Sequence, residues 1–511
     1  MIEKSAPSRN EWLLLAGAVL CLFAGLSATP LIDLDEGAFT AATLEMFARG
    51  DFLLTYLNGE PRYDKPILIY WLQALSVSVL GFDEFALRLP SAFMGLVWVG
   101  LAFHFADKLF DRRTAIFAAI ITATAAGPSF IARIATADAL LDACIAAAVF
   151  FQYLWLRLDQ PRYRLLGWAA MGFGFLAKGP VALVLPLCTL LLHCASRRQW
   201  RQALNYVSDG KAILLFLTIA LPWYVAVTWV KGPEFLEAFF FKHNVGRFSG
   251  AMGNHHAYGY FYYLPIALLV SLPFTGILFS LPVRLRSLWH DDFARYALIL
   301  FALVFLLFSL SANKLPHYLL YGTSALWVLL ARQMLIARSR WQLLPALLLF
   351  VALLFLPDLL EAARLKSNRH YQLLLADLAT WFGMPYRLAL GGAIAVAIFS
   401  LINRSYSLTH KLALCGILTS LVFSLAVLPA LGGTLQSGVR QAGQIARDIE
   451  APLVMYGLNI PSLSVYASRV VLRRKPQTGD LVLLPVDKLD DLPPRQLIFK
   501  DKSLALVRIT D

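Results

Sequence analysis

The chain is organised as a series of long apolar stretches separated by short polar turns. A membrane-spanning helix needs about 20 mostly apolar residues, with a range of about 17–25. This pattern predicts an all-α polytopic membrane protein with about thirteen transmembrane helices plus interfacial helices. The candidate spans are 12–31, 88–106, 114–132, 138–156, 165–177, 179–195, 212–230, 258–281, 296–311, 317–336, 342–357, 386–402 and 411–430.

The apolar stretch 66–80 (PILIYWLQALSVSVL) decides the orientation. If it does not cross, the basic clusters between the spans all fall on one side, which the positive-inside rule makes cytoplasmic. We therefore expect an interfacial helix at 66–80, a cytoplasmic N-terminus and two long outer loops at 32–65 and 231–257. The basic clusters lie at 4–9, 108–113, 157–164, 197–211, 284–295, 332–340 and 404–411.

The character of the chain changes after residue 430. An amphipathic stretch is followed by four short apolar runs, LVMYG, LVLLPV, QLIFK and LALVRI, which Gly, Pro and Asp separate. Such runs are typical of short strands. We expect a transmembrane domain over 1–430 and a small α/β domain over 431–511 on the outer face.

Composition narrows the class of protein. The 511 residues are 59% hydrophobic and 15% charged, whereas soluble domains have roughly 45–50% apolar and about 25% charged residues. This excludes a purely soluble enzyme and a disordered protein, and five cysteines without a CxxC pair do not form a zinc or disulfide framework. A net charge of +13 would favour nucleic acid in a soluble protein. Here membrane topology explains it, so no nucleic-acid partner is expected.

The predicted outer face concentrates ionisable residues, which are costly near a membrane span. The first outer loop starts with an acidic DLDE segment. It continues with a predicted helix over 36–49 that Gly50 ends, an Asn58-Gly59 turn and the sequence RYDKP. The candidate residues of this face are Asp35, Glu36, Tyr63, Asp64, Lys65, Asp138, Lys178, His243, Arg247, Lys314, His317 and Tyr318.

This mixture of acids and cations suits a substrate that carries a phosphate group and a hydroxyl. Lys and Arg would hold the phosphate oxygens, and a carboxylate would remove the proton of an attacking hydroxyl. A polyprenyl-phosphate sugar would place its lipid in the bilayer, its phosphate at the interface and its sugar outside. Direct displacement with one base predicts inversion at the sugar carbon.

The order of six short motifs resembles a known family. The acidic pair after the first span, RYDKP, TADALL, AKGP, KHNVGRF and KLPHY are similar to the GT-C membrane glycosyltransferases, in the branch of the bacterial aminoarabinose transferases and protein O-mannosyltransferases. The resemblance covers about residues 10–330, and it implies a bacterial inner membrane whose outer face is the periplasmic side. It implies that Asp35 is the catalytic acid of the first loop, that Lys65 and Arg247 hold the lipid phosphate, and that Asp138 is a second active-site acid. The family often has Glu near the position of Asp64.

Simpler roles exist for several of these residues. Asp35 and Asp138 could each stabilise a helix N-terminus, and Lys178 could extend along a span toward the interface. Asp64 and His243 could bind a divalent cation such as Zn or Mg, or His243 could be an ordinary interfacial histidine.

The functional reading also has alternatives. We expect transfer from an undecaprenyl-type phosphate sugar to lipid A or another lipopolysaccharide component. The alternatives are a protein O-mannosyltransferase-like enzyme and, from another class, a secondary transporter or lipid flippase. A transporter favours charges near mid-span, whereas here they cluster at the outer ends. The sequence names neither the sugar nor the acceptor.

Overall fold

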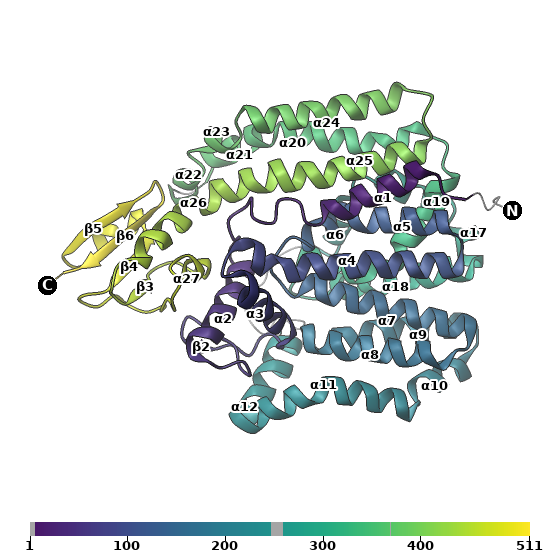
Figure 1. The fold of residues 1–511 in the computed structure, drawn as a ribbon, viewed down its shortest axis with the longest axis horizontal. Coiled ribbons are helices and arrows are strands. Elements are labelled where there is room, and N and C mark those ends of the chain that lie inside the picture. Colours follow the sequence, from purple (N-terminus) through teal and green to yellow (C-terminus); the bar gives the residue numbers. More distant parts are fainter. Residues whose placement is uncertain (1–5, 247–258, 368, 511) are drawn as a thin grey trace.

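A computed structural model describes residues 6–246, 259–367 and 369–510. The chain forms a body of long, roughly parallel helices with a small β-sheet at one end, and the N-terminus lies at the opposite end (Figure 1). Helices α2 and α3 lie at the same end as the sheet. This end therefore carries the first predicted outer loop and the C-terminal part of the chain.

The first part of the chain, up to residue 246, is mostly helical. Its elements are α1 (Arg9–Cys21), α2 (Asp35–Arg49), β1 (Tyr56–Leu57), β2 (Glu60–Pro61), α3 (Leu68–Leu80), α4 (Glu84–Leu109), α5 (Arg112–Thr124), α6 (Ala126–Ile131), α7 (Asp138–Leu158), α8 (Pro161–Lys178), α9 (Val181–Ser196), α10 (Trp200–Val207), α11 (Gly210–Lys231), α12 (Pro233–Leu236) and the π-helix η1 (Glu237–Val245).

The second part adds further helices and the sheet. Its elements are α14 (Tyr263–Val270), α15 (Thr275–Leu278), α16 (Ser280–Val283), α17 (Leu285–His290), α18 (Asp292–Leu310), the 3₁₀ helix η2 (Pro316–Gly322), α19 (Ser324–Ile336), η3 (Arg340–Leu343), α20 (Leu344–Leu354), α21 (Leu356–Leu365), α22 (Arg369–Leu374), α23 (Leu378–Trp381), α24 (Met384–Ile402), α25 (Leu408–Val422), η4 (Phe423–Val427), α26 (Leu428–Arg447), β3 (Leu453–Met455), α27 (Ser462–Tyr466), β4 (Leu481–Pro485), η5 (Val486–Asp491), β5 (Arg495–Lys500) and β6 (Leu504–Ile509).

Fewer helices than expected are long enough to cross a membrane unaided. In the described parts of the chain, six helices meet the length and hydropathy for a span, or up to eight if two bent pairs each count as one. The predicted span 12–31 is shorter because α1 ends at Cys21 and Gly25 adopts a φ of 76°. The predicted span 114–132 is interrupted between α5 and α6 at Ala125, which is extended. The count of about thirteen is therefore not confirmed.

The helix at 66–80 is too short to cross. Helix α3 contains 13 residues, and at 1.5 Å per residue its length is about 20 Å. The hydrocarbon core of a bilayer is about 30 Å thick. This length suits the interfacial position expected from the sequence.

The first outer loop folds as its sequence pattern predicts. Helix α2 ends at Arg49, and Gly50 takes a left-handed conformation with a φ of 67°. Asn58 and Gly59 join β1 to β2 with φ values of 57° and 88°, as a type I′ hairpin turn requires. The expected outer loop 231–257 is helical over its described part, as α12 and η1.

The C-terminal part is the small mixed α/β unit expected from the sequence. Its four strands match the four apolar runs and form a sheet in the order β3-β4-β6-β5, in which only β3 and β4 are parallel. The last predicted span and the amphipathic stretch after it form one unbroken helical run of 40 residues, Leu408–Arg447. The predicted division at residue 430 therefore falls inside a continuous helix.

Helix α7 forms the centre of the helical body. In its most apolar window 83% of the residues are buried inside the protein, compared with 28% for α11 and for α24. Because α7 contacts so much protein, its first residue is held firmly at the end of the body that carries α2 and α3.

Candidate active site

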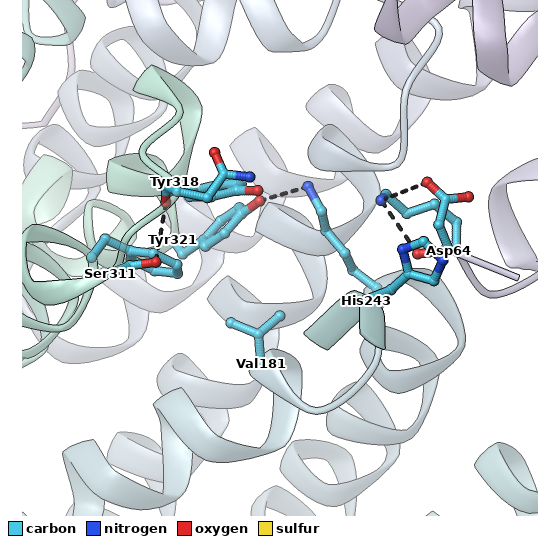
Figure 2. Close-up of a pocket in the computed structure, with 10 residues that line it drawn as sticks. Asp64, Val181, His243, Ser311, Tyr318 and Tyr321 are labelled. Atoms are coloured by element: carbon cyan, nitrogen blue, oxygen red, sulfur yellow. Dashed lines mark hydrogen bonds and ion pairs between the residues drawn. The ribbon is translucent and has the colours of Figure 1, made fainter. Parts of the chain in front are cut away.

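A pocket of about 120 Å³ lies between the RYDKP segment that precedes α3, the end of α8 and the segment after α18. In Figure 2, Tyr318 and Tyr321 lie on one side of the pocket and Asp64 with His243 on the other. Five of the predicted site residues therefore meet around one space, although they come from distant parts of the sequence. The lining residues are Asp64, Lys65, Lys178, Val181, His243, Phe308, Ser311, Asn313, Tyr318 and Tyr321.

One wall of the pocket is built around Asp138, the first residue of α7. Lys178, the last residue of α8, donates a hydrogen bond to Asp138 Oδ1. Tyr321 donates to the same oxygen at 2.8 Å and accepts a hydrogen bond from Lys178 Nζ, also at 2.8 Å. His317 Nε2 lies 3.5 Å from Asp138 Oδ1, and the Thr136 hydroxyl donates to Oδ2 at 3.1 Å. Asp138 does not line the pocket but orients two residues that do.

The 3₁₀ helix η2 explains why two tyrosines face the pocket. In a 3₁₀ helix residues i and i+3 lie above one another, so Tyr318 and Tyr321 share a side. Lys178 Nζ lies 5.4 Å from the centre of the Tyr318 ring and 5.5 Å from that of Tyr321. Both rings are within range of a cation–π interaction with this ammonium.

The opposite wall is the RYDKP segment. Arg62 Nε donates to Asp64 Oδ1 at 2.6 Å, and Lys65 Nζ donates to Asp64 Oδ2 at 3.2 Å. Arg62 also donates to the Ala38 carbonyl at 2.6 Å, which fastens this segment to α2. Burial alone would lower the pKa of Arg62, but the Asp64 carboxylate outweighs it and raises that pKa above its ordinary value. Arg62 therefore stays charged and holds Asp64 beside Lys65.

Asp35 stands at the edge of this arrangement. It is the first residue of α2 and is exposed, and it does not line the pocket. Its charge nevertheless acts on Arg62, Lys178 and His317. An exposed carboxylate within electrostatic reach of the pocket cations can approach a hydroxyl that enters from outside.

Three further candidate residues of the outer face, Glu36, Lys314 and Tyr63, lie outside the pocket lining. The Glu36 carboxylate is buried and pairs with Arg88 at 2.7 Å, so it faces the protein interior. The Lys314 ammonium donates to the Ser311 carbonyl at 2.7 Å. Tyr63 packs edge-to-face on Phe235 with ring centres 5.8 Å apart. Arg247 lies outside the described residues.

Asp64 and His243 both line the pocket, as the sequence-based hypothesis of a cation site requires. Among residues 6–246, 259–367 and 369–510, however, no group of three or more His, Cys, Asp or Glu side chains could hold a metal ion. A divalent cation at this position stays a prediction.

Sequence reasoning missed several residues that the structure places at the site, and two of them, Tyr321 and Arg62, bond directly to predicted site residues. Tyr321 follows Tyr318 by three positions in KLPHYLLYG, and a 3₁₀ reading of that segment would have found it. Arg62 stands beside the selected RYDKP residues, and only its contact with Asp64 reveals its role. In sum, the pocket offers two ammonium groups, each paired with an acid, beside aromatic rings. This arrangement suits an anionic group attached to a sugar.

Comparison with known proteins gives consistent results. The family model of the dolichyl-phosphate-mannose-protein mannosyltransferases matches residues 64–225. An uncharacterized protein of Aquifex aeolicus is 36% identical over 303 residues, which is 59% of this chain and 67% of that protein. An undecaprenyl phosphate-alpha-4-amino-4-deoxy-L-arabinose arabinosyl transferase of Pseudomonas aeruginosa is 32% identical over 328 residues, 61% of this chain and 57% of that enzyme. The match thus spans little more than half the length of this enzyme.

Solved structures share the fold. The crystal structure of ArnT from Cupriavidus metallidurans bound to undecaprenyl phosphate matches with a TM-score of 0.83 and 22% identity, over 98% of both chains. The apo form of the same protein matches with a TM-score of 0.78. Together with the candidate spans, this fold identifies the chain as a multi-pass integral membrane protein.

Proposed function

Because the chain belongs to the GT-C family of membrane glycosyltransferases that the dolichyl-phosphate-mannose-protein mannosyltransferase model describes, we propose that it transfers a sugar from a polyprenyl-phosphate donor to an acceptor hydroxyl. One observation carries this proposal. Two lysine–aspartate pairs, Lys65 with Asp64 and Lys178 with Asp138, come from three separate segments of the sequence, and both lysines line one pocket.

The pocket supports a phosphate-linked donor. Lys65 and Lys178 both line it, and their side chains are only 11% and 14% exposed. An ammonium group with little water around it attracts a phosphate oxygen more strongly than one in bulk solvent. Lys65 is our candidate for the lipid phosphate, with Arg247 beside it on the basis of the sequence resemblance.

In the proposed reaction Asp35 accepts the proton of the acceptor hydroxyl. The hydroxyl oxygen forms a bond to the sugar C1 atom, while the bond from C1 to the phosphate oxygen breaks and its electron pair stays on the phosphate. Lys65 stabilises the charge that develops on this leaving group. Attack from the side opposite the phosphate inverts the configuration at C1. Lys178, held by Asp138 and Tyr321, orients the sugar or its phosphate.

We further propose the orientation expected from the sequence. The N-terminus would be cytoplasmic, and the pocket, the first outer loop and the C-terminal α/β domain would face the periplasm of the bacterial inner membrane. Consecutive shorter helices, such as α5 with α6 over the predicted span 114–132, and the bent pairs would each form one crossing and, with the long helices, would complete about thirteen. The basic clusters between predicted spans support this orientation.

Undecaprenyl phosphate sugar is the donor that we favour, and lipid A or another lipopolysaccharide component is the acceptor. The donor is the one for which the Pseudomonas aeruginosa relative is named. The acceptor rests on the sequence resemblance. A protein hydroxyl is the second candidate, since the matching family model is named for protein mannosyltransferases.

Purified protein in lipid, a radiolabelled polyprenyl-phosphate sugar and candidate acceptors test this function directly. We expect transfer by the wild type and a loss of at least 100-fold in Asp35→Asn and Lys65→Ala. Asp487→Asn and Lys475→Ala, which alter exposed residues of the C-terminal domain, serve as matched controls and should leave transfer unchanged. Full activity in Asp35→Asn and Lys65→Ala would contradict the assignment of the site.

Mass spectrometry of lipid A and surface glycans, with and without the gene, identifies the acceptor. A modified lipid A lost on deletion supports the lipid acceptor, and an altered glycoprotein supports the second candidate. Movement of labelled lipid across the membrane without transfer would favour a flippase.

A further inference from the structure

The residue that follows Asp35 in the sequence belongs to a fully buried ion pair. Glu36 follows Asp35 in the first turn of α2, and Arg88 lies in α4. The two residues are 1% and 2% exposed. Arg88 Nε donates to Glu36 Oε1 at 2.7 Å and Arg88 Nη2 donates to Oε2 at 2.8 Å. This two-point contact fixes the orientation of both groups.

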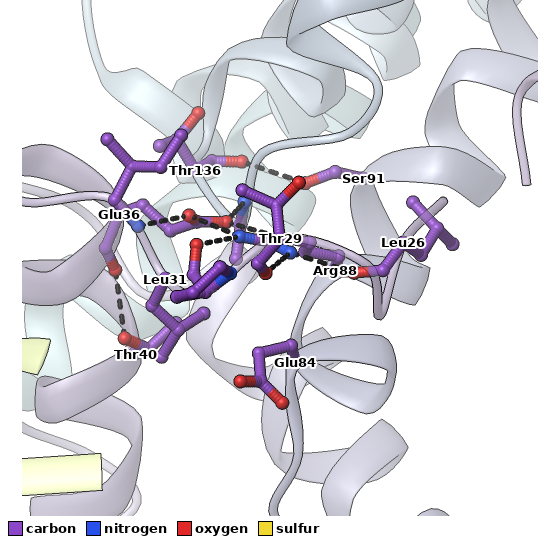
Figure 3. Close-up of polar contacts among 12 residues, drawn as sticks. Leu26, Thr29, Leu31, Glu36, Thr40, Glu84, Arg88, Ser91 and Thr136 are labelled. Carbon is purple, nitrogen blue, oxygen red and sulfur yellow. Dashed lines mark hydrogen bonds and ion pairs between the residues drawn. The ribbon is translucent and has the colours of Figure 1, made fainter. Parts of the chain in front are cut away.

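The guanidinium of Arg88 also donates hydrogen bonds to the backbone of the segment between α1 and α2. Its Nη1 donates to the carbonyls of Leu26 at 2.8 Å and Thr29 at 2.6 Å, and its Nη2 donates to the Pro30 carbonyl at 3.0 Å. Glu36 Oε2 in turn accepts from the Ile32 amide at 2.7 Å. The segment 26–36, which carries Asp35, is thus wrapped around the pair (Figure 3).

The same carboxylate reaches the segment in front of Asp138. Glu36 Oε1 accepts a hydrogen bond from the Ala135 amide at 2.9 Å. The Ala135 carbonyl accepts from Gln73, and the neighbouring Thr136 carbonyl accepts from Ser91. One carboxylate therefore contacts the backbone before both proposed acids, at Ile32 three residues before Asp35 and at Ala135 three residues before Asp138.

We propose that Glu36 and Arg88 are a positioning pair that sets Asp35 relative to Asp138, and this inference rests on the function proposed above. Displacement of a reacting group by about 1 Å can reduce a rate by about 100-fold. Neither Glu36 nor Arg88 lines the pocket, so they act through the acids that they hold.

A purely structural ion pair is the competing explanation, and the chain supplies a matched control. Glu11, which is 2% exposed, pairs with Arg113 at 2.6 Å and accepts from the Ser8 amide. This pair also lies at the start of a helix but contacts no predicted site residue. Glu11→Gln removes a buried charge of the same kind far from the pocket.

Hydrogen exchange of the full-length protein in nanodiscs tests the coupling without any assumption about activity. In Glu36→Gln we expect the amides of 31–37 and of 132–138 to exchange at least tenfold faster, while Glu11→Gln changes neither segment. Arg88→Lys keeps the charge but loses donors to the 26–30 carbonyls, so it should loosen 26–32 and spare 132–138. Unchanged exchange of 132–138 in Glu36→Gln would overturn the proposal.

Kinetics then separate positioning from stability. The kcat of each variant is normalised to the number of molecules that bind undecaprenyl phosphate. For Glu36→Gln we expect kcat to fall about 100-fold while the KM for the donor changes less than about twofold. An unchanged normalised kcat would mean that the pair only stabilises the fold, which overturns the inference. If the wild type transfers no sugar, the proposed function fails, and the exchange result alone still decides whether the pair couples the two segments.

Discussion

Lys178, the last residue of α8, donates a hydrogen bond to Asp138, the first residue of α7. The two helices form an antiparallel hairpin joined by Asp159 and Gln160, so the end of one meets the start of the other. A carboxylate is favoured at a helix N-terminus and an ammonium at a C-terminus. The helix dipoles therefore support the ion pair, and the pair fixes one wall of the pocket.

The first prediction concerns this ion pair. Asp138→Asn and Lys178→Met should each lower transfer by about 100-fold, since each change leaves its partner without a counter-charge. The double variant should lose little more than either single variant, because the two residues act as a unit. Initial rates of the wild type, the two single variants and the double variant measure this coupling. Fully multiplicative losses would show that the residues act independently.

The second prediction concerns Tyr321. Tyr321→Phe removes the hydroxyl that donates to Asp138 and accepts from Lys178, so we expect a loss of activity of about tenfold with little change in stability. Tyr296→Phe is the matched control, because Tyr296 is also buried but bonds to Val149 and Gln152 away from the pocket. Equal activities of the two variants would exclude a role for the Tyr321 hydroxyl.

The third prediction concerns the residue after Lys178. Gly179 has a φ of 82°, and an added Cβ would lie 2.7 Å from Phe239 Cζ. Gly179→Ala should lower the free energy of unfolding by about 1–3 kcal/mol and reduce activity by moving Lys178. Gly210→Ala, whose Cβ would meet nothing within 4 Å, should be neutral or slightly stabilising. Thermal unfolding in detergent compares the two, and equal melting temperatures would contradict the strain at Gly179.

The fourth prediction concerns Asp33, whose carboxyl receives hydrogen bonds from the backbone and hydroxyl of Ser462 in α27. Burial raises the pKa of Asp33 to about 7, although the Ser462 hydrogen bonds oppose that rise. Between the ordinary value near 4 and this raised value, the folded state holds a proton that the unfolded state has lost. Stability from this group should therefore fall as the pH rises from about 4 to about 7 and level off above that.

Melting temperatures between pH 5 and 8 measure this effect. The wild type should lose stability over this range relative to Asp33→Asn, whose amide stays neutral and can still bond to Ser462. The difference between the two proteins should be smallest at pH 5 and should favour Asp33→Asn at pH 8. A difference that does not vary with pH would show that Asp33 does not titrate there.

Local patterns were enough to predict much of this fold. The helix of the first outer loop, the Asn58-Gly59 turn and the four strands depend on neighbouring residues, and the structure contains all of them. The number of spans could not be predicted in the same way, because helix breaks such as that at Gly25 depend on packing as well as on hydropathy.

Part of the site could also be predicted from the sequence. The order of the motifs predicted that Lys65, Lys178 and Tyr318 lie on one face of the membrane, and these residues line the pocket. Glu36 was a candidate for substrate binding, but unlike the exposed Asp35 it is buried and pairs with Arg88, which lies 52 positions away. Nothing in the local sequence around Glu36 reveals that partner.

The contact between Asp33 and Ser462 also has a consequence for biosynthesis. These residues are 429 positions apart, so at about 5–20 residues per second the ribosome needs about 20–90 s after Asp33 to produce its partner. The segment that carries Asp35 would therefore gain this support only after Ser462 has been synthesised. A nascent chain that has not reached Ser462 would lack this support, so the Asp35 segment would complete its packing only once α27 has been made.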